Sequence, residues 1–60
     1  MNSEELFQNI KNHFDAFEEN HLVFASKGNK AAGQRARKSI GEIKKLVTDY
    51  RKQSVAESKA

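Results

Sequence analysis

The sequence predicts an all-α fold, an antiparallel, coiled-coil-like hairpin of two helices. Three observations lead to this prediction. The 60 residues contain no proline, and the abundant Ala, Glu, Lys, Leu and Arg favour helix over sheet. Apolar residues recur in two segments with alternating steps of three and four, the spacing of a heptad seam along a helix. A Gly–Asn pair at positions 28 and 29 separates the two segments.

The first helix is expected from about residue 3 to about residue 26. Ser3 can serve as its N-cap, and Glu4 and Glu5 follow where the helix dipole favours negative charge. With the repeat lettered a to g, its seam at positions a and d consists of Phe7, Ile10, Phe14, Phe17, His21 and Phe24. On this seam His21 is interpreted as a packed histidine, with a ligand or pH-sensing role as the alternative.

A tight turn over residues 27–29 is expected to reverse the chain. Gly28 suits the left-handed conformation that ends a helix, and Asn29 can cap the next one. The second helix is expected from about residue 30 to about residue 54, followed by a frayed tail over 55–60. Its a and d seam consists of Gly33, Ala36, Ile40, Ile43, Val47 and Tyr50.

One register of the hairpin pairs every member of the two seams. The residue numbers of each pair add up to 57: Phe24 with Gly33, His21 with Ala36, Phe17 with Ile40, Phe14 with Ile43, Ile10 with Val47, and Phe7 with Tyr50. Near the turn, large side chains would face small ones, which allows the helices to approach closely. We therefore expect a single domain over residues 1–60.

A two-helix hairpin buries only part of each seam, so we expect two copies to pair into a four-helix bundle. The expected docking edge is position g, which carries no charge over most of its length, with Leu22 and Val23 nearby. The residues of this edge are Leu6, His13, Asn20, Ala32, Ser39, Leu46 and Gln53. The predicted protein partner is thus a second copy of the chain.

Charge is divided unevenly along the sequence. Eleven Lys and Arg against eight Asp and Glu give a net charge of +3. Residues 1–26 hold five acids and one base, a net charge of −4, whereas residues 27–60 hold ten bases and three acids, a net charge of +7. This asymmetry indicates an anionic partner.

Eight of the ten bases after residue 26 fall into two heptad rows of the second helix. Row e holds Lys30, Arg37, Lys44 and Arg51, and row f holds Lys38, Lys45, Lys52 and Lys59. The rows could meet successive phosphates of a nucleic acid without reading its bases. The alternative is a solvated face, in which Glu4 could pair with Arg51 and Glu18 with Arg37 while row f has no partner in the hairpin.

Two segments of the sequence are similar to segments of a known protein family. They are "KGNKAAGQRAR" at 27–37 and "YRKQSVAESK" at 50–59. Through them the chain resembles the bacterial linker-histone-like proteins, the family typified by the chlamydial histone-like nucleoid protein and found also in Bacteroidetes. The resemblance covers nearly the whole chain. It implies a nucleoid-associated protein that organises the chromosome and binds DNA with little sequence preference. At matching positions it implies DNA contacts by Lys27, Lys30, Arg35, Arg37, Arg51 and Lys52.

The favoured function is therefore DNA binding through backbone phosphates. Charge pattern and resemblance together give nine candidate residues: Lys27, Lys30, Arg35, Arg37, Lys38, Lys44, Lys45, Arg51 and Lys52. The alternative is a dimerisation or protein-interaction hairpin that does not bind DNA. A peripheral membrane binder is the weakest of the three interpretations, because the register would consume the apolar face that such a protein needs.

Other functions are not expected from this composition. The chain has no cysteine and two histidines, so we expect no metal site, and the absence of a nucleophile–base arrangement argues against an enzyme, a cofactor or a small-molecule substrate. The start "MNSEEL" does not resemble a signal or transit peptide, and the longest apolar run, 22–25, is too short to span a membrane. The expected location is the cytoplasm, at the bacterial nucleoid.

Overall fold

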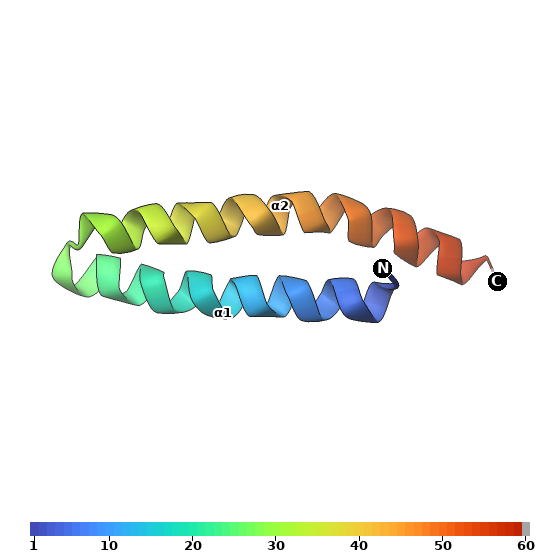
Figure 1. Ribbon diagram of the computed structural model, residues 1–60, viewed down its shortest axis with the longest axis horizontal. Helices are drawn as coiled ribbons and strands as arrows, with labels where there is room; N and C mark the ends of the chain where they lie inside the picture. Colours follow the sequence, from blue (N-terminus) through green and yellow to red (C-terminus); the bar gives the residue numbers. More distant parts are fainter. Residues whose placement is uncertain (60) are drawn as a thin grey trace.

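The protein is an all-helical hairpin, as the sequence predicts. The computed structural model describes residues 1–59, which form two helices and no strand. Helix α1 spans Ser3–Lys27 and helix α2 spans Lys30–Ser58, and the two pack side by side and antiparallel (Figure 1). The molecule is a rod of 48 × 14 × 13 Å.

Helix α1 begins at Ser3, and its N-cap is Asn2 and not, as expected, Ser3. The Asn2 side chain accepts a hydrogen bond of 2.8 Å from the backbone N–H of Glu5, whose carboxylate accepts one of 3.2 Å from the backbone N–H of Asn2. This reciprocal arrangement is a capping box, and it satisfies two backbone donors that the helix leaves unpaired. Ser3 is left free to bind elsewhere.

The turn between the helices follows the prediction. Gly28 has a φ of +65°, in the left-handed region that glycine adopts without strain, and its N–H donates to the carbonyl oxygen of Phe24 at 2.8 Å. Asn29 caps α2 by accepting a hydrogen bond of 3.1 Å from the N–H of Ala32. Two residues thus suffice to reverse the chain.

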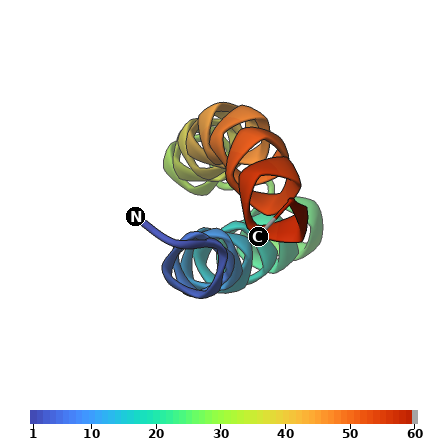
Figure 2. The ribbon, with the colours of Figure 1, turned by 90° about the vertical axis from the view of Figure 1, so that its right-hand side faces the viewer.

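Helix α2 continues to Ser58, about four residues beyond its predicted end, so residues 55–58 are helical where a frayed tail is expected; Ala60 lies outside the described residues. The Glu57 carboxylate explains the added turn. It accepts hydrogen bonds from the Ser3 N–H at 2.8 Å, from the Ser3 hydroxyl and from the Gln53 amide, which lower the pKa of Glu57 below 4.5. Figures 1 and 2 show this end of α2 leaning toward the start of α1.

The contact between the helices is rotated around each helix relative to the predicted seam, so that it is centred between positions d and g. Apart from Gly33 at position a, its residues lie at d and g and not at a and d. The most buried apolar side chains are Leu6, 3% exposed, Ala32, 0%, and Ala36, 6%. The other residues of this contact are partly buried: Ile10, His13, Phe17, Asn20, Ser39, Ile43, Leu46 and Gln53.

This rotation follows from the small side chains beside the turn. Ala32, Gly33 and Ala36 are all buried, and together they let α1 approach closest over the d and g side of α2. A Cβ built on Gly33 would lie 2.8 Å from Cδ1 of Phe24, so the predicted contact of Phe24 with Gly33 does form. The predicted docking edge at g, however, is already occupied by the other helix of the same hairpin.

Most of the a positions consequently form an exposed apolar stripe along one side of the hairpin; Gly33, an a residue, is buried instead, and Phe24, a d residue that is exposed, belongs to the stripe. Phe7 is 48% exposed and Phe14 49%. We define the apolar stripe by six residues: Phe7, Phe14, His21, Phe24, Ile40 and Val47, each of them exposed. Near the turn the stripe is hollowed into a groove between His21 and Ile40, with Gly33 and Ala36 in its lining. The His21 ring lies against Phe17 at a centroid distance of 5.9 Å, so this histidine is stacked but not buried.

Candidate nucleic-acid interface

The candidate interface is the outward side of α2. This helix runs without interruption from Lys30 to Ser58, so residues seven apart lie about 10.5 Å apart along nearly one line. All nine sequence-predicted residues, and Lys59 as well, are exposed. Seven of the nine belong to the two basic rows, e and f, and the other two are Lys27 and Arg35.

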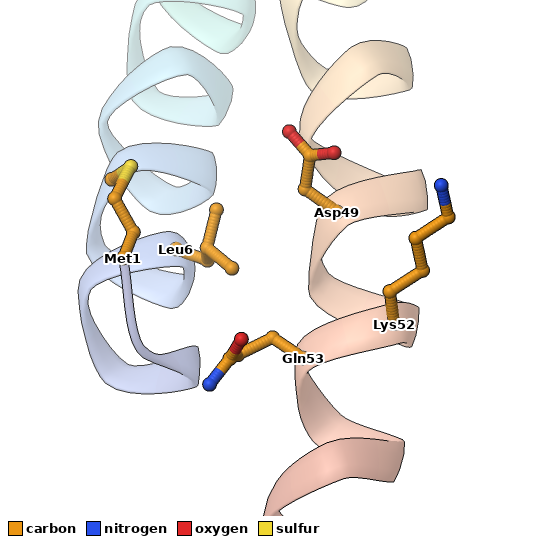
Figure 3. A pocket seen from close by; sticks show the side chains of 5 residues that line it. All are labelled: Met1, Leu6, Asp49, Lys52 and Gln53. Carbon is orange, nitrogen blue, oxygen red and sulfur yellow. The ribbon is translucent and has the colours of Figure 1, made fainter.

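Neighbouring residues near the end of α2 show how the helix separates its two sides. Figure 3 shows Lys52, in row f, extending away from α1, whereas Gln53 and Leu6 point into the space between the helices. The adjacent Asp49 stands on the same helix between these two directions. The outward placement of the lysine follows from helix geometry, because residues one apart differ by about 100° around the axis.

Row e is free of the ion pairs that the solvated-face alternative proposes. In the described part of the chain, neither Glu4 with Arg51 nor Glu18 with Arg37 forms an ion pair. The rotation of the contact to d and g explains this, since it turns both e rows away from the opposite helix. Arg37 instead borders the groove of the apolar stripe.

Row f is not wholly without acidic partners, contrary to the sequence analysis. Lys45 forms an ion pair with Glu42, three residues earlier on the same helix, at a distance of 3.7 Å. Both side chains are exposed, so this pair contributes little and competes weakly with a phosphate. The sequence contains the signal for it, because residues three apart are neighbours on a helix surface.

Arg35 and Lys27 lie apart from the two rows. The Nε–H of Arg35 donates a hydrogen bond of 2.8 Å to the side-chain oxygen of Asn20 on α1, which ties this guanidinium across the hairpin on its other flank. Lys27 is in the last turn of α1, where a positive charge also suits the helix dipole. Of the positions implied by the resemblance, Lys30, Arg37, Arg51 and Lys52 belong to the rows and these two do not.

Between the rows runs a line of uncharged residues at position b. Thr48 and Val55 line a shallow hollow on α2 together with Arg51 of row e and Lys52 of row f. Further toward the hairpin bend, a Cβ built on Gly41 would meet no atom within 4 Å. The outward side of α2 therefore consists of two ridges of cationic side chains, rows e and f, with a line of smaller uncharged side chains between them.

Other kinds of site find no support among residues 1–59. No group of three or more His, Asp or Glu side chains is placed to hold a metal ion. Neither α1 nor α2 combines the length and apolar character needed to cross a membrane.

Comparison with known proteins gives one match. The model of a protein family described as "Histone H1-like protein Hc1" matches residues 4–60, and this range contains nearly all of both helices and all nine candidate residues. No curated protein and no solved structure shows significant similarity to the chain.

Proposed function

The chain belongs to the histone H1-like protein Hc1 family, and from this we propose that it is a histone-like DNA-binding protein of the bacterial nucleoid. The family is one of DNA-packaging proteins and not of enzymes. A nucleoid role implies a cytoplasmic location. The proposal extends to chromosome organisation, the role that packaging DNA serves.

The observation that best supports DNA binding is the charge of the outward side of α2. Its exposed bases repeat at a spacing of about 10.5 Å along one continuous helix. Lys and Arg side chains that neutralise phosphates release condensed counterions, which is the main source of sequence-independent affinity for DNA. We propose that rows e and f contact the phosphate backbone, with the uncharged line of Gly41, Thr48 and Val55 between them.

The same surface supports binding without strong sequence preference. Most of its cations are lysines on flexible stems, which suit point contacts to phosphates and not bidentate reading of base edges. The rows follow the length of a helix, whereas base readout requires a few side chains inserted into a groove. The proposed contact residues are the nine candidates given by the sequence, with Lys27 and Arg35 peripheral.

We propose further that the protein functions as a homodimer. The exposed apolar stripe favours this proposal and also the alternative function, a dimerisation or protein-interaction hairpin without direct DNA binding. It also removes the argument against a peripheral membrane binder, because the apolar side chains are not consumed between the helices.

Titration of the chain with two duplex DNAs of unrelated sequence, over a series of salt concentrations, tests the proposal. We expect similar affinities for both duplexes and a linear fall of log affinity with log salt, by about 0.9 for each phosphate neutralised. Absence of binding at about 50 mM salt, where such contacts are strong, would refute the proposal and favour the interaction hairpin. A preference for one duplex that persists as salt rises would contradict the phosphate mechanism.

A further inference from the structure

We infer that a second copy of the chain docks on the apolar stripe, with α1 of each copy against α2 of the other. This inference rests on the homodimer proposed above and names its surface, which is position a and not the g edge expected from the sequence. It does not require DNA to be bound. The stripe runs along both helices through Phe7, Phe14, His21, Phe24, Ile40 and Val47.

The hairpin leaves more surface exposed than a compact monomer of its mass would. A compact monomer of 6.8 kDa exposes about 4000 Å², whereas this chain exposes 4684 Å². The excess of roughly 700 Å² is close to the ~800 Å² that each partner buries in an interface of standard size. Two thin rods packed side by side would remove this excess, because each is only 14 × 13 Å across.

The uncharged face of each helix is wider than a single helix pair requires. Uncharged residues occupy not only positions d and g, which are used inside the hairpin, but also position a. Positions a and d are mainly apolar, whereas g also holds the polar residues His13, Asn20, Ser39 and Gln53. A face of three positions in seven is typical of a helix that contacts two neighbours in a bundle, whereas a single helix pair needs two. Residues mainly at d and g meet the other helix of the same chain, and the exposed residues at a, with Phe24, are left for a helix of the second copy.

The charges beside the stripe favour one arrangement of the two copies. Beside the stripe, α1 carries Glu4, Lys11 and Glu18 at position e, and α2 carries the four bases of row e. If α1 met α1 and α2 met α2, the two rows of four bases would face each other. If α1 of one copy meets α2 of the other, Glu18 approaches the second copy's Arg37 and Glu4 approaches its Arg51, while Lys11, which pairs with Asp15 of its own helix at 3.3 Å, approaches Lys44. Two contacts of opposite charge then outnumber one of like charge, and every adjacent pair of helices is antiparallel.

This dimer changes what the basic rows present to DNA. Row e borders the dimer interface and is partly neutralised by the other copy, whereas row f points away from it. The bundle would thus expose two copies of row f, one from each chain, on opposite outer sides. A dimer could in this way contact two DNA segments at once.

The mass in solution tests the docking surface. We expect the wild-type chain at micromolar concentration to sediment with twice its mass of 6.8 kDa. The variant Phe7→Ser with Phe14→Ser should sediment as a monomer, whereas the control Leu22→Ser should remain a dimer. Leu22 is also exposed and apolar, at 59%, but it lies outside the stripe. Circular dichroism checks that each variant is still helical.

A charge exchange tests the arrangement even if the Phe variants unfold. Glu18→Lys alone and Arg37→Glu alone should each weaken self-association, on the order of tenfold, because both copies then present like charges at both contacts. An equimolar mixture of the two variants should dimerise better than either variant alone, because both contacts of the mixed dimer join opposite charges. At one contact the unchanged Glu18 and Arg37 meet, and at the other the two substituted residues meet with the signs exchanged. Ion pairs within one chain cannot give that result.

Three outcomes would overturn the inference. They are a monomeric wild type at micromolar concentration, a dimer unaffected by the Phe substitutions, and a mixture that associates no better than its components. A monomer that floats with anionic vesicles would assign the stripe to a membrane surface. DNA titration of the same samples keeps the two proposals apart, because a monomer that still binds duplex DNA refutes the dimer and leaves the DNA-binding function standing.

Discussion

At the scale of single residues, two glycines of α2 occupy opposite environments. A Cβ on Gly33 would meet the Phe24 ring at 2.8 Å, and a Cβ on Gly41 would meet nothing within 4 Å. Alanine is favoured over glycine inside a helix by about 1 kcal/mol, but overpacking a close contact costs roughly 1–3 kcal/mol. Of these two glycines, only the first supports the close helix approach at the turn.

We therefore predict opposite effects of the same substitution. Gly41→Ala should raise the free energy of unfolding by about 1 kcal/mol, through helix propensity. Gly33→Ala should lower it by about 1 kcal/mol, the balance of propensity against displacement of Phe24. Thermal unfolding followed by circular dichroism measures both, and stabilisation by both would show that the ring moves aside without cost.

The carboxylate of Glu57 joins the two chain ends and makes their stability depend on pH. Hydrogen bonds from Ser3 and Gln53 hold the pKa of this carboxylate below 4.5. Because the folded state binds this proton less readily than the unfolded state, the contribution is present above the unfolded pKa and disappears as pH falls through the lowered folded pKa. The last turn of α2 should loosen in acid.

The variant Glu57→Gln isolates this effect from the other carboxylates. We expect it to melt at a lower temperature than wild type at neutral pH, and the difference to shrink as pH is lowered below 4.5. Unfolding midpoints of the two proteins over a pH series make the comparison. A difference that stays constant with pH would mean that the carboxylate charge plays no part.

At the scale of the helices, sequence periodicity predicted the two elements and their antiparallel packing but not the face on which they meet. Steps of three and four connect positions d and g as regularly as positions a and d, so spacing alone does not distinguish the two seams. Hydrophobicity favoured the phenylalanines at a. In the structure, α1 instead approaches α2 most closely over Ala32 and Ala36. The polar residues His13 and Asn20 are partly buried in this contact.

Adjacent residues at the start of α1 test which seam forms. Leu6→Ala should lower the free energy of unfolding by about 2–3 kcal/mol, because this side chain is 3% exposed. Phe7→Ala, at a residue that is 48% exposed, should cost about 1 kcal/mol or less under dilute conditions where the chain is monomeric. Denaturant unfolding at low concentration measures both, and the reverse order would restore the a and d seam.

The other differences have equally local causes. Asn2 is the N-cap in place of the expected Ser3, because a capping box needs an acid three residues after the cap. Glu5 stands at that distance from Asn2. The prediction of a frayed tail after residue 54 was wrong because it did not include the contact of Glu57 with Ser3. This contact joins opposite ends of the chain, so local sequence does not indicate it. The Gly28 and Asn29 turn was predictable because both residues act through their own backbone and side chain.

At the scale of the whole molecule, the hairpin divides its surface by function. Residues mainly at d and g hold the helices together, residues mainly at a form the apolar stripe, and the basic rows occupy the outward side of α2. The exposed cations could be predicted from the sequence, because seven-residue spacing on a continuous helix fixes their line. The exposed stripe could not, since it appears only when the actual contact face is known.

The central claim is that the basic rows of α2 contact DNA phosphates, and a matched pair of variants tests it most directly. Lys38→Gln with Lys45→Gln removes two charges from row f, and Lys27→Gln with Arg35→Gln removes two from outside the rows. In duplex-DNA titrations over a salt series, the first variant should reduce the slope of log affinity against log salt by about 1.8, roughly 0.9 for each phosphate that is no longer neutralised. The second should change it by less than half as much. Equal slopes for the two variants, or a larger change in the second, would contradict the claim.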